Sequence, residues 1–346
     1  MQITRRSPSQ SGSSKEVPEM GEPILEVRDA RIYFPVREGL FRKVVAQVKA
    51  LDGVSLSIDK GDTLGLVGES GSGKTTLVNG ISMLERLTAG SVLFQGTDLA
   101  KLTKQARKDM RRHIQIVFQD PFWSLNSRWL TRDIVGEPLR AHEKRMRGDR
   151  YQDTVAEALH MVGLETDDLF KYPHEFSGGM RQRIAIARAL ILRPRLVILD
   201  EPTSAIDVLS QHQILLMLQD LKQRLGLTFI LVSHDLSVVG YLATRIAVMY
   251  AGKVMEYGPT SAVFTDQLHP YTQALLQSVP DPRIDGVAAL VSLSGEVASA
   301  LDPPAGCRFH PRCIYAMDIC SQQEPPQMKG GKDHYACCWL LDDGHR

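Results

Sequence analysis

The sequence predicts an α/β protein built around a parallel β-sheet. Short apolar segments at residues 63–68, 114–118, 196–199 and 228–233 alternate with helix-like segments, a pattern typical of parallel strands joined by helices. The chain has 346 residues, of which 43% are hydrophobic and 23% charged, as in ordinary soluble globular proteins. No run approaches the ~18 consecutive apolar residues of a membrane span. Any action at a membrane would therefore need a partner.

The elements follow in order along the chain. Residues 1–22 are rich in Ser, Pro and Gln and are predicted to form a disordered tail. The alternation in ILEVRDARIYF, which begins at Ile24, and the segment VKALDGVSLSI predict an antiparallel β subdomain. Residues from about 101 to 185 are more charged and helical, and are expected to form an insertion into the sheet domain. A helix is predicted after Asp207, with a stop at Gly226 and apolar residues at helical spacing at Ile214, Leu218, Leu221 and Leu225.

The last part of the chain differs from the rest. One large domain is expected over residues 23–280, and beyond it Pro and Gly become frequent, which predicts a separate small module over 281–346. This module contains all five cysteines: Cys307, Cys313, Cys320, Cys337 and Cys338. An odd number of cysteines without a secretory signal does not predict a disulfide framework. A cytosolic compartment is expected, where clustered thiols more often mean a metal site or redox chemistry.

The charge balance bears on the partners. The chain carries 41 Lys and Arg against 40 Asp and Glu, a net charge of +1, which argues against a protein that coats nucleic acid. The basic stretches at 111–113 and 144–150 have acidic residues nearby and are interpreted as a solvated helical face.

A glycine-rich turn after the strand at 63–68 predicts a phosphate-binding loop. The segment GESGSGKTT fits G-x-x-x-x-G-K-[ST], the pattern of a loop whose backbone N–H groups surround phosphates at a helix N-terminus. An accidental match of a Gly/Ser turn is expected about once in a hundred chains of this length. Lys74 would reach the β and γ phosphates of ATP, and Thr75 would bind Mg²⁺. The residues of this loop are Gly68, Glu69, Ser70, Gly71, Ser72, Gly73, Lys74, Thr75 and Thr76.

Polar residues end three of the predicted strands. Asp200 and Glu201 follow an apolar strand, the position from which α/β folds hold Mg²⁺ beside such a loop. Asp200 would hold the ion, and Glu201 would polarise the attacking water as a general base or an orienting group. An Asp-Glu pair in a solvated turn is the alternative. Gln119 and His234 end the neighbouring strands and are expected beside the γ-phosphate, although each alone could be a strand cap.

A second anion cradle opens a helix at Ser177, Gly178 and Gly179 in HEFSGGMRQRIAIARAL. Two chains facing head to tail could use both cradles. With GESGSGKTT, VFQDP, FSGGM, LVILDEP, SAID and SHD in this order, the sequence resembles the ATP-binding subunits of ABC transporters over about residues 24–340. SHDLSVV, HPYTQALL, LSGE and PPAGCRFHPRC make it most similar to the oligopeptide/dipeptide importer family.

The resemblance implies roles for further residues and partners. Phe34, or else Tyr33, would stack on adenine, and Asp207 would touch the opposite nucleotide site. Ser177, Gly178 and Gly179 would act in trans, in a head-to-tail dimer with a second ATP-binding subunit, heteromeric by family habit. Gln119 would help to hold Mg²⁺, and with the insertion that follows it would face two transmembrane permease subunits. An extracytoplasmic solute-binding protein and a peripheral location on the cytoplasmic face of the inner membrane are also implied.

The chain departs from the family pattern at several positions. Ile206 stands where Leu is usual, a near-isosteric change expected to be silent, and Met180 stands where Gln is commoner. Trp123 replaces a small residue or Tyr, and Ser127 replaces Pro. These last two lie in the region expected to contact the membrane partner, so partner choice is expected to be unusual.

The cysteine spacing allows several interpretations. It lacks the C-x₂-C pairs of most zinc sites, whereas four irregularly spaced thiolates suit a 4Fe–4S cluster held by Cys307, Cys313, Cys320 and Cys337. The family resemblance favours the same cluster. Zinc and free or structural thiols remain open, and Cys338 would be the spare. The ATPase reaction is not expected to require this module.

The predicted function is ATP hydrolysis that energises import of di- or oligopeptides. Nickel, an opine or glutathione are alternative solutes, because other subunits select the solute. A soluble ABC ATPase acting on DNA or ribosomes is the rival class. The single phosphate loop, the absence of an internal repeat, and the separation of 109 positions from Gly68 to Ser177 without sustained heptads disfavour it.

Overall fold

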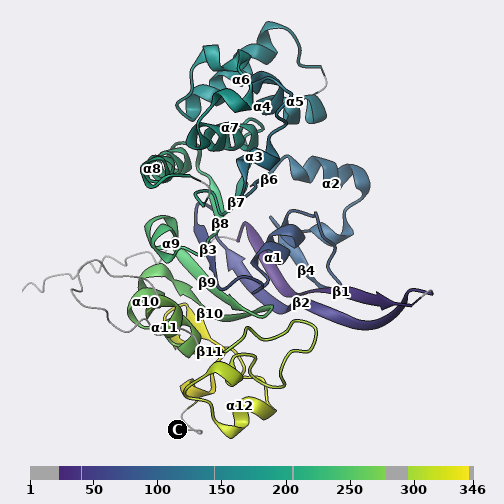
Figure 1. Cartoon of the computed structure of the whole chain (residues 1–346), viewed down its shortest axis with the longest axis vertical. Helices are drawn as coiled ribbons and strands as arrows, with labels where there is room; N and C mark the ends of the chain where they lie inside the picture. Colours follow the sequence, from purple (N-terminus) through teal and green to yellow (C-terminus); the bar gives the residue numbers. More distant parts are fainter. Residues whose placement is uncertain (1–22, 40, 144, 205, 278–294, 343–346) are drawn as a thin grey trace, which may run out of the picture.

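The computed structural model describes residues 23–39, 41–143, 145–204, 206–277 and 295–342. Residues 1–22, for which a disordered tail was predicted, lie outside this part. A large β-sheet crosses the middle of the molecule, with strand order β11-β12-β10-β9-β3-β8-β7-β6 (Figure 1). Its strands are β3 (Thr63–Val67), β6 (Ile114–Val117), β7 (Leu196–Asp200), β8 (Thr228–Val232), β9 (Arg245–Tyr250), β10 (Lys253–Pro259), β11 (Met328–Gly331) and β12 (His334–Ala336).

The central strands confirm the predicted parallel α/β fold. β6, β7, β8, β3 and β9 run parallel in that spatial order, and the four predicted strands match the observed bounds to within one residue. Every residue of β3, β7 and β8 is buried, as expected where both faces of a parallel sheet are covered. The helices that follow these strands are α1 (Lys74–Ile81), α8 (Val208–Leu225) and α9 (Leu236–Leu242). Since parallel strands end at one edge, the residues that follow them meet there.

A second, antiparallel sheet with the order β2-β1-β4-β5 packs on the first. Its strands are β1 (Leu25–Glu38), β2 (Lys43–Ile58), β4 (Ala89–Phe94) and β5 (Thr97–Asp98). Leu25 and Val92 share a hydrophobic core with Leu64 and Ile198 of the parallel sheet. β1 and β2 continue past the body of the molecule as a projecting arm (Figure 1).

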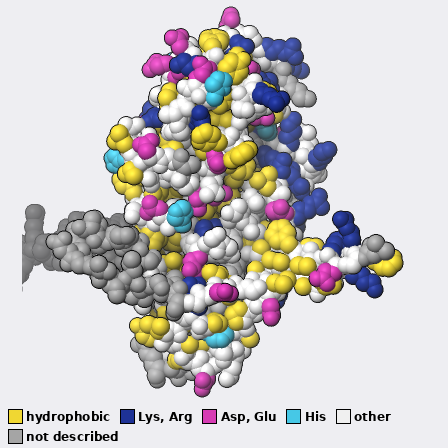
Figure 2. Space-filling model, in the orientation of Figure 1, with side chains coloured by type: hydrophobic (Ala, Val, Ile, Leu, Met, Phe, Trp, Pro, Cys, Tyr) yellow, Lys and Arg dark blue, Asp and Glu magenta, His cyan; other side chains and the backbone are white. Residues whose placement is uncertain are grey.

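The predicted helical insertion is divided by β6, which pairs with β7 in the main sheet. One helix, α2 (Lys104–Arg111), precedes β6. The others follow it and form the layer above the sheet in Figure 1: α3 (Pro121–Ser124), α4 (Thr131–Val135), α5 (Glu137–His142), α6 (Asp149–Met161) and α7 (Gly178–Leu190). Lys and Arg side chains gather along the edge where α2 and α5 lie (Figure 2). In the described part of the chain, no helix combines the length and apolar character needed to cross a membrane.

The C-terminal segment contributes two strands to the main sheet. After α10 (Thr260–Thr265) and α11 (Pro270–Gln277), the chain is described again from residue 295 and includes α12 (Asp318–Gln322). β12 then pairs antiparallel with β10, and β11 pairs with β12. The sequence pattern missed this pairing because β11 and β12 are short and carry little apolar alternation.

Candidate nucleotide-binding site

The phosphate-binding loop lies between β3 and α1, as the sequence predicts. Gly68 has φ +146°, and a Cβ there would come within 2.1 Å of the Met249 carbonyl oxygen. Gly73 has φ +102°, and its Cβ would come within 2.6 Å of the Ala50 carbonyl oxygen. Both positions therefore require glycine, on conformational and on steric grounds. The loop turns tightly enough for its N–H groups to face an anion at the start of α1.

Lys74 lies across this loop and is only 8% exposed. Its Nζ donates hydrogen bonds to the carbonyl oxygens of Gly68, at 2.7 Å, and Glu69, at 2.9 Å. Burial lowers the pKa of Lys74, while the carboxylates of Glu201, Asp200 and Glu69 act in the opposite direction. The ammonium group is therefore held among acceptors at the place where phosphates would enter.

Asp200 and Glu201 stand at the carboxyl end of β7. Asp200 is buried, and this burial, followed by the charge of Glu201, raises its pKa, while Lys74 opposes the shift. Glu201 has φ +45°, which is unusual for a residue with a side chain, and its N–H donates to Val232 of β8 at 2.9 Å. The neighbouring strand β8 therefore holds the backbone of Glu201 in this strained conformation.

Gln119 and His234 both reach Glu201. Gln119 Nε2 donates to Glu201 Oε2 at 2.6 Å, and His234 Nδ1 lies 3.0 Å from Glu201 Oε1. Each of the two residues follows its strand, β6 or β8, by two positions. The sheet thus brings together residues that are far apart in the sequence, as the strand pattern predicts.

The second cradle lies in a different part of the molecule. Ser177 is the N-cap of α7, where its hydroxyl accepts from the N–H of Met180 at 3.3 Å, and Gly178 begins the helix. Asp207 caps α8 in the same way and accepts from Ser210 at 3.0 Å, a bond that lowers its pKa. α7 belongs to the helical layer, away from the loop before α1 (Figure 1). One chain therefore does not bring its own Ser177, Gly178 and Gly179 to its own phosphate loop.

The two aromatic candidates for adenine stacking differ in their contacts. Phe34 is 37% exposed, whereas the Tyr33 hydroxyl donates to the Asp52 carboxylate of β2. Arg308 of the C-terminal segment also donates to Asp52. Burial alone raises the pKa of Asp52, but these hydrogen-bonded and charged neighbours lower it below its usual value. The Phe34 ring is therefore more exposed to solvent, whereas the Tyr33 side chain is held by a hydrogen bond.

Comparison with known proteins relates this chain to transport ATP-binding proteins. Residues 51–204 match the family model "ABC transporter", and residues 255–320 match "Oligopeptide/dipeptide transporter, C-terminal region". The oligopeptide transport ATP-binding protein AppF of Bacillus subtilis is 47% identical over 92% of this chain and 98% of its own length. The dipeptide transport ATP-binding protein DppF of Escherichia coli is 44% identical over 93% of this chain and 95% of its own.

The chain belongs to the ATP-binding subunits of the oligopeptide/dipeptide ABC transporter family. Solved structures of ATP-binding cassettes resemble the fold of this chain. A dimeric ATP-binding cassette, MJ0796, bound to ADP and phosphate after hydrolysis, superposes with a TM-score of 0.61 at 29% identity. The match covers 68% of this chain and 98% of that one.

Sequence reasoning missed two residues that touch the phosphate loop, Tyr271 in α11 and Arg312 in the C-terminal segment. Arg312 forms a paired hydrogen bond with the Glu69 carboxylate, and the Tyr271 hydroxyl accepts from the Glu69 N–H at 2.9 Å. HPYTQALL and CRFHPRC, which mark the family, contain these residues. The motifs alone gave no indication of what the side chains contact, because the partner lies about 200 to 240 positions earlier in the sequence.

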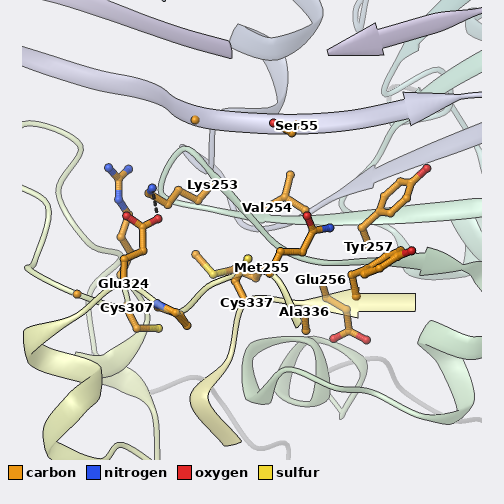
Figure 3. A pocket seen from close by; sticks show the side chains of 16 residues that line it. Ser55, Lys253, Val254, Met255, Glu256, Tyr257, Cys307, Glu324, Ala336 and Cys337 are labelled. Carbon is orange, nitrogen blue, oxygen red and sulfur yellow. Dashed lines mark hydrogen bonds and ion pairs between the residues drawn. The ribbon is translucent and has the colours of Figure 1, made fainter. Parts of the chain in front are cut away.

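The cysteines are arranged differently from the predicted set. The thiol of Cys338 interacts electrostatically with those of Cys307, Cys313 and Cys320, and burial raises its pKa to about 12. Cys337, predicted as the fourth ligand, lies instead against Glu324 and Lys253. It lines a cavity of about 220 Å³ between β2, β10 and the C-terminal segment, beside Met255 (Figure 3). Adjacent residues of an extended segment point in opposite directions, so Cys338 and not Cys337 interacts with the other three thiols.

No group of three or more His, Cys, Asp or Glu side chains suited to a single metal ion occurs among the described residues. A zinc ion would hold its sulfur ligands at about 2.3 Å, and therefore close to one another. A cluster with one thiolate on each of four irons spreads its ligands further. The thiols of Cys307, Cys313, Cys320 and Cys338 interact electrostatically without forming a single-ion group of this kind among the described residues.

Proposed function

We propose that this chain hydrolyses ATP to energise the import of di- or oligopeptides through a membrane transporter. One observation carries the ATPase part: Gln119 and His234 converge on Glu201 at the sheet edge that also holds the phosphate loop. The peptide part is supported by the relatives, which are named oligopeptide and dipeptide transport ATP-binding proteins, and by the matching C-terminal region.

The residues at the sheet edge suit the roles that hydrolysis requires. The loop residues Gly68 to Thr76 would hold the phosphates, with Lys74 on the β and γ groups. Thr75, Gln119 and Asp200 offer a hydroxyl, an amide and a carboxylate oxygen, the ligands that Mg²⁺ prefers. Magnesium would neutralise charge on the β and γ phosphates. Phe34, with Tyr33 as the alternative, would stack on adenine.

Glu201 would act on the water molecule. Its carboxylate, aimed by Gln119 and His234, accepts a hydrogen bond from the attacking water and polarises it. The water oxygen forms a bond to the γ phosphorus as the bond to the bridging oxygen breaks, giving ADP and phosphate. The proton leaves toward the Glu201 carboxylate, and His234 on the other side keeps that carboxylate oriented.

Complete sites would form between two ATP-binding subunits. Ser177, Gly178 and Gly179 of one subunit would close on the ATP of the other, next to Asp207, because each chain keeps its two cradles apart. The dimeric arrangement of MJ0796 supports this assembly. We infer a heterodimer that docks on two permease subunits at the cytoplasmic face of the inner membrane, supplied by an extracytoplasmic solute-binding protein.

The permease would dock near α3, which follows Gln119. Large apolar side chains are exposed there, above all Trp123, which is 90% exposed, and Phe122. Arg181 lies with its guanidinium carbon 4.1 Å from the centre of the Phe122 ring. A contact at this place would link the permease to Gln119 and so to Glu201. Trp123 and Ser127 would then set partner choice.

We also propose that the C-terminal segment binds a 4Fe–4S cluster through Cys307, Cys313, Cys320 and Cys338. Support comes from the proximity of these four thiols. Such a cluster would cross-link a segment that has little core of its own.

Transport in reconstituted vesicles tests the main proposal. The complex purified with its permease should take up a labelled dipeptide or oligopeptide only with ATP, and Glu201→Gln should abolish uptake. Glu157→Gln, on the exposed side of α6, serves as the control. Uptake of nickel, an opine or glutathione without peptide uptake would contradict the substrate class. Failure to associate with any membrane protein would contradict the transport function.

A further inference from the structure

The C-terminal segment contacts the phosphate loop through a charged pair. Arg312 Nη1 donates to Glu69 Oε2 at 2.6 Å, and Arg312 Nη2 donates to Glu69 Oε1 at 3.1 Å. The Arg312 side chain is 4% exposed and that of Glu69 is 25% exposed. A two-bonded, largely buried Arg–carboxylate pair fixes geometry as well as charge. Most ion pairs on protein surfaces do neither.

The backbone of Glu69 is held from the same side. Its N–H donates to the hydroxyl of Tyr271, which is fully buried in α11. The Tyr271 ring packs against Tyr250, at 4.8 Å between ring centres, and against Phe309, at 5.2 Å. Phe309 lies three residues before Arg312, so one aromatic cluster supports both contacts to Glu69. The direction of the Glu69 side chain is therefore set from outside the loop.

Glu69 in turn contacts the residue that would meet the phosphates. Its carbonyl oxygen accepts from Lys74 Nζ at 2.9 Å and from the N–H of Ser72 at 3.2 Å. Its carboxylate also acts on Lys74 through its charge. Arg312, Glu69 and Lys74 thus form a continuous series of contacts from the C-terminal segment into the loop.

We propose that Arg312 is a positioning residue for ATP, which acts through Glu69 on the phosphate loop. This inference rests on the proposed ATP binding at Lys74. Arg312 neutralises a carboxylate that would otherwise repel the phosphates and compete with them for Lys74. It also holds Glu69 in the direction that leaves the loop open. The C-terminal segment, expected from the sequence to be unnecessary for the ATPase reaction, is then part of the machinery that sets ATP affinity.

The substitution Arg312→Ala in the full chain tests this role. The affinity for MgATP, measured by titration calorimetry, should fall about tenfold, as expected for loss of one charge-assisted pair. In the assembled transporter the KM for ATP should rise similarly, while kcat changes little, because Glu201, Gln119 and His234 stay in place. Lys329→Ala, at an exposed site on β11, is the matched control and should leave both values unchanged.

A double-substitution cycle separates positioning from a purely structural role. Once Glu69→Ala has removed the carboxylate that Arg312 holds and neutralises, adding Arg312→Ala should cause no further loss of affinity, because both substitutions act on the same interaction. Arg312→Lys should recover part of the affinity, since it restores the charge without the paired geometry.

Two results would overturn the inference: an affinity of Arg312→Ala within twofold of the unchanged chain, or losses that multiply in the double variant. Should Arg312→Ala fail to fold, judged by circular dichroism, the same cycle is run with Arg312→Lys and Glu69→Gln. An unchanged chain that does not bind MgATP would instead contradict the proposed function, which distinguishes the two failures.

Discussion

Gln119 donates a hydrogen bond of 2.6 Å to the Glu201 carboxylate across the ends of two parallel strands. Gln119 leads into α3, where a permease would dock, whereas Glu201 follows Asp200 beside the phosphate loop. A shift of α3 would therefore be expected to change the hydrogen bonding of Glu201, the residue proposed to polarise water. Under the proposed docking of a permease at α3, this single hydrogen bond would carry the effect of the membrane partner to the chemical step.

Glu201→Gln removes the negative charge but keeps a side chain of the same size. ATP binding should be retained, because Lys74 and the loop are unaffected, whereas turnover should fall by about a hundredfold or more as the group that polarises water is lost. Phosphate release and nucleotide binding, measured on the same preparation, check this. Near-normal hydrolysis would remove Glu201 from the role.

Ser177→Arg places a bulky cation in the second cradle. Because Ser177 lies away from its own phosphate loop, ATP binding to the isolated chain should be unchanged. Turnover of the assembled transporter should fall by about a hundredfold, as for loss of a preorganised anion site. Ser177→Thr, which keeps the hydroxyl that caps α7, is the control. Equal turnover in both variants would argue against closure in trans.

His269 makes the fold sensitive to acid. It is completely buried beside Phe309, and burial lowers its pKa from 6.5 to about 3. Below pH 6.5 the unfolded chain binds a proton at His269, whereas the folded chain stays unprotonated there until the pH approaches its lower pKa. The free energy of unfolding therefore falls as the pH decreases from 6.5 toward about 3. By pH 5 the loss from this group should be about 2 kcal/mol.

Urea unfolding at pH 7.5 and pH 5 measures this loss. His269→Asn keeps an acceptor for the N–H of Tyr271, and it should remove this part of the pH dependence. His212→Asn, at an exposed site on α8, should leave it unchanged. Identical pH dependence in His269→Asn and the unchanged chain would exclude His269 as the cause.

The two adjacent cysteines should behave differently. Protein purified without oxygen should be brown and contain iron if the four neighbouring thiols hold a cluster. Cys338→Ser should lose the colour, whereas Cys337→Ser should keep it, since Cys337 lies against Glu324 and Lys253. A colourless, iron-free preparation of the unchanged chain would contradict the cluster. Loss of colour in Cys337→Ser alone would contradict the choice of ligands.

The sequence was sufficient to predict where the residues that follow the parallel strands lie. Fully apolar strands such as β7 and β8 are recognised from four or five residues, and the polar residue after each must lie at the common edge. Gln119, Asp200, Glu201 and His234 could therefore be placed together without a structure. The glycines of the phosphate loop can be recognised from the sequence equally well. Gly68 and Gly73 occupy backbone conformations and spaces that exclude a Cβ, so only glycine fits there.

The C-terminal contacts could not be predicted in this way. Arg312 is one arginine among many, and nothing in its own neighbourhood indicates Glu69, 243 positions earlier. Cys337 and Cys338 are adjacent, so spacing could not decide between them, whereas the direction of each side chain does. These features depend on which surfaces pack together, and local pattern carries no information about that.

The pairing of β12 with β10 has a consequence for solubility. Without β11 and β12, β10 would be the last strand of the sheet and would expose its unpaired N–H and C=O groups as a template for strands of other molecules. β11 replaces it with a four-residue border strand that contains Lys329 and two glycines, a poor template for further growth. A chain shortened before residue 328 would be expected to self-associate through this border, whatever happens to its nucleotide site.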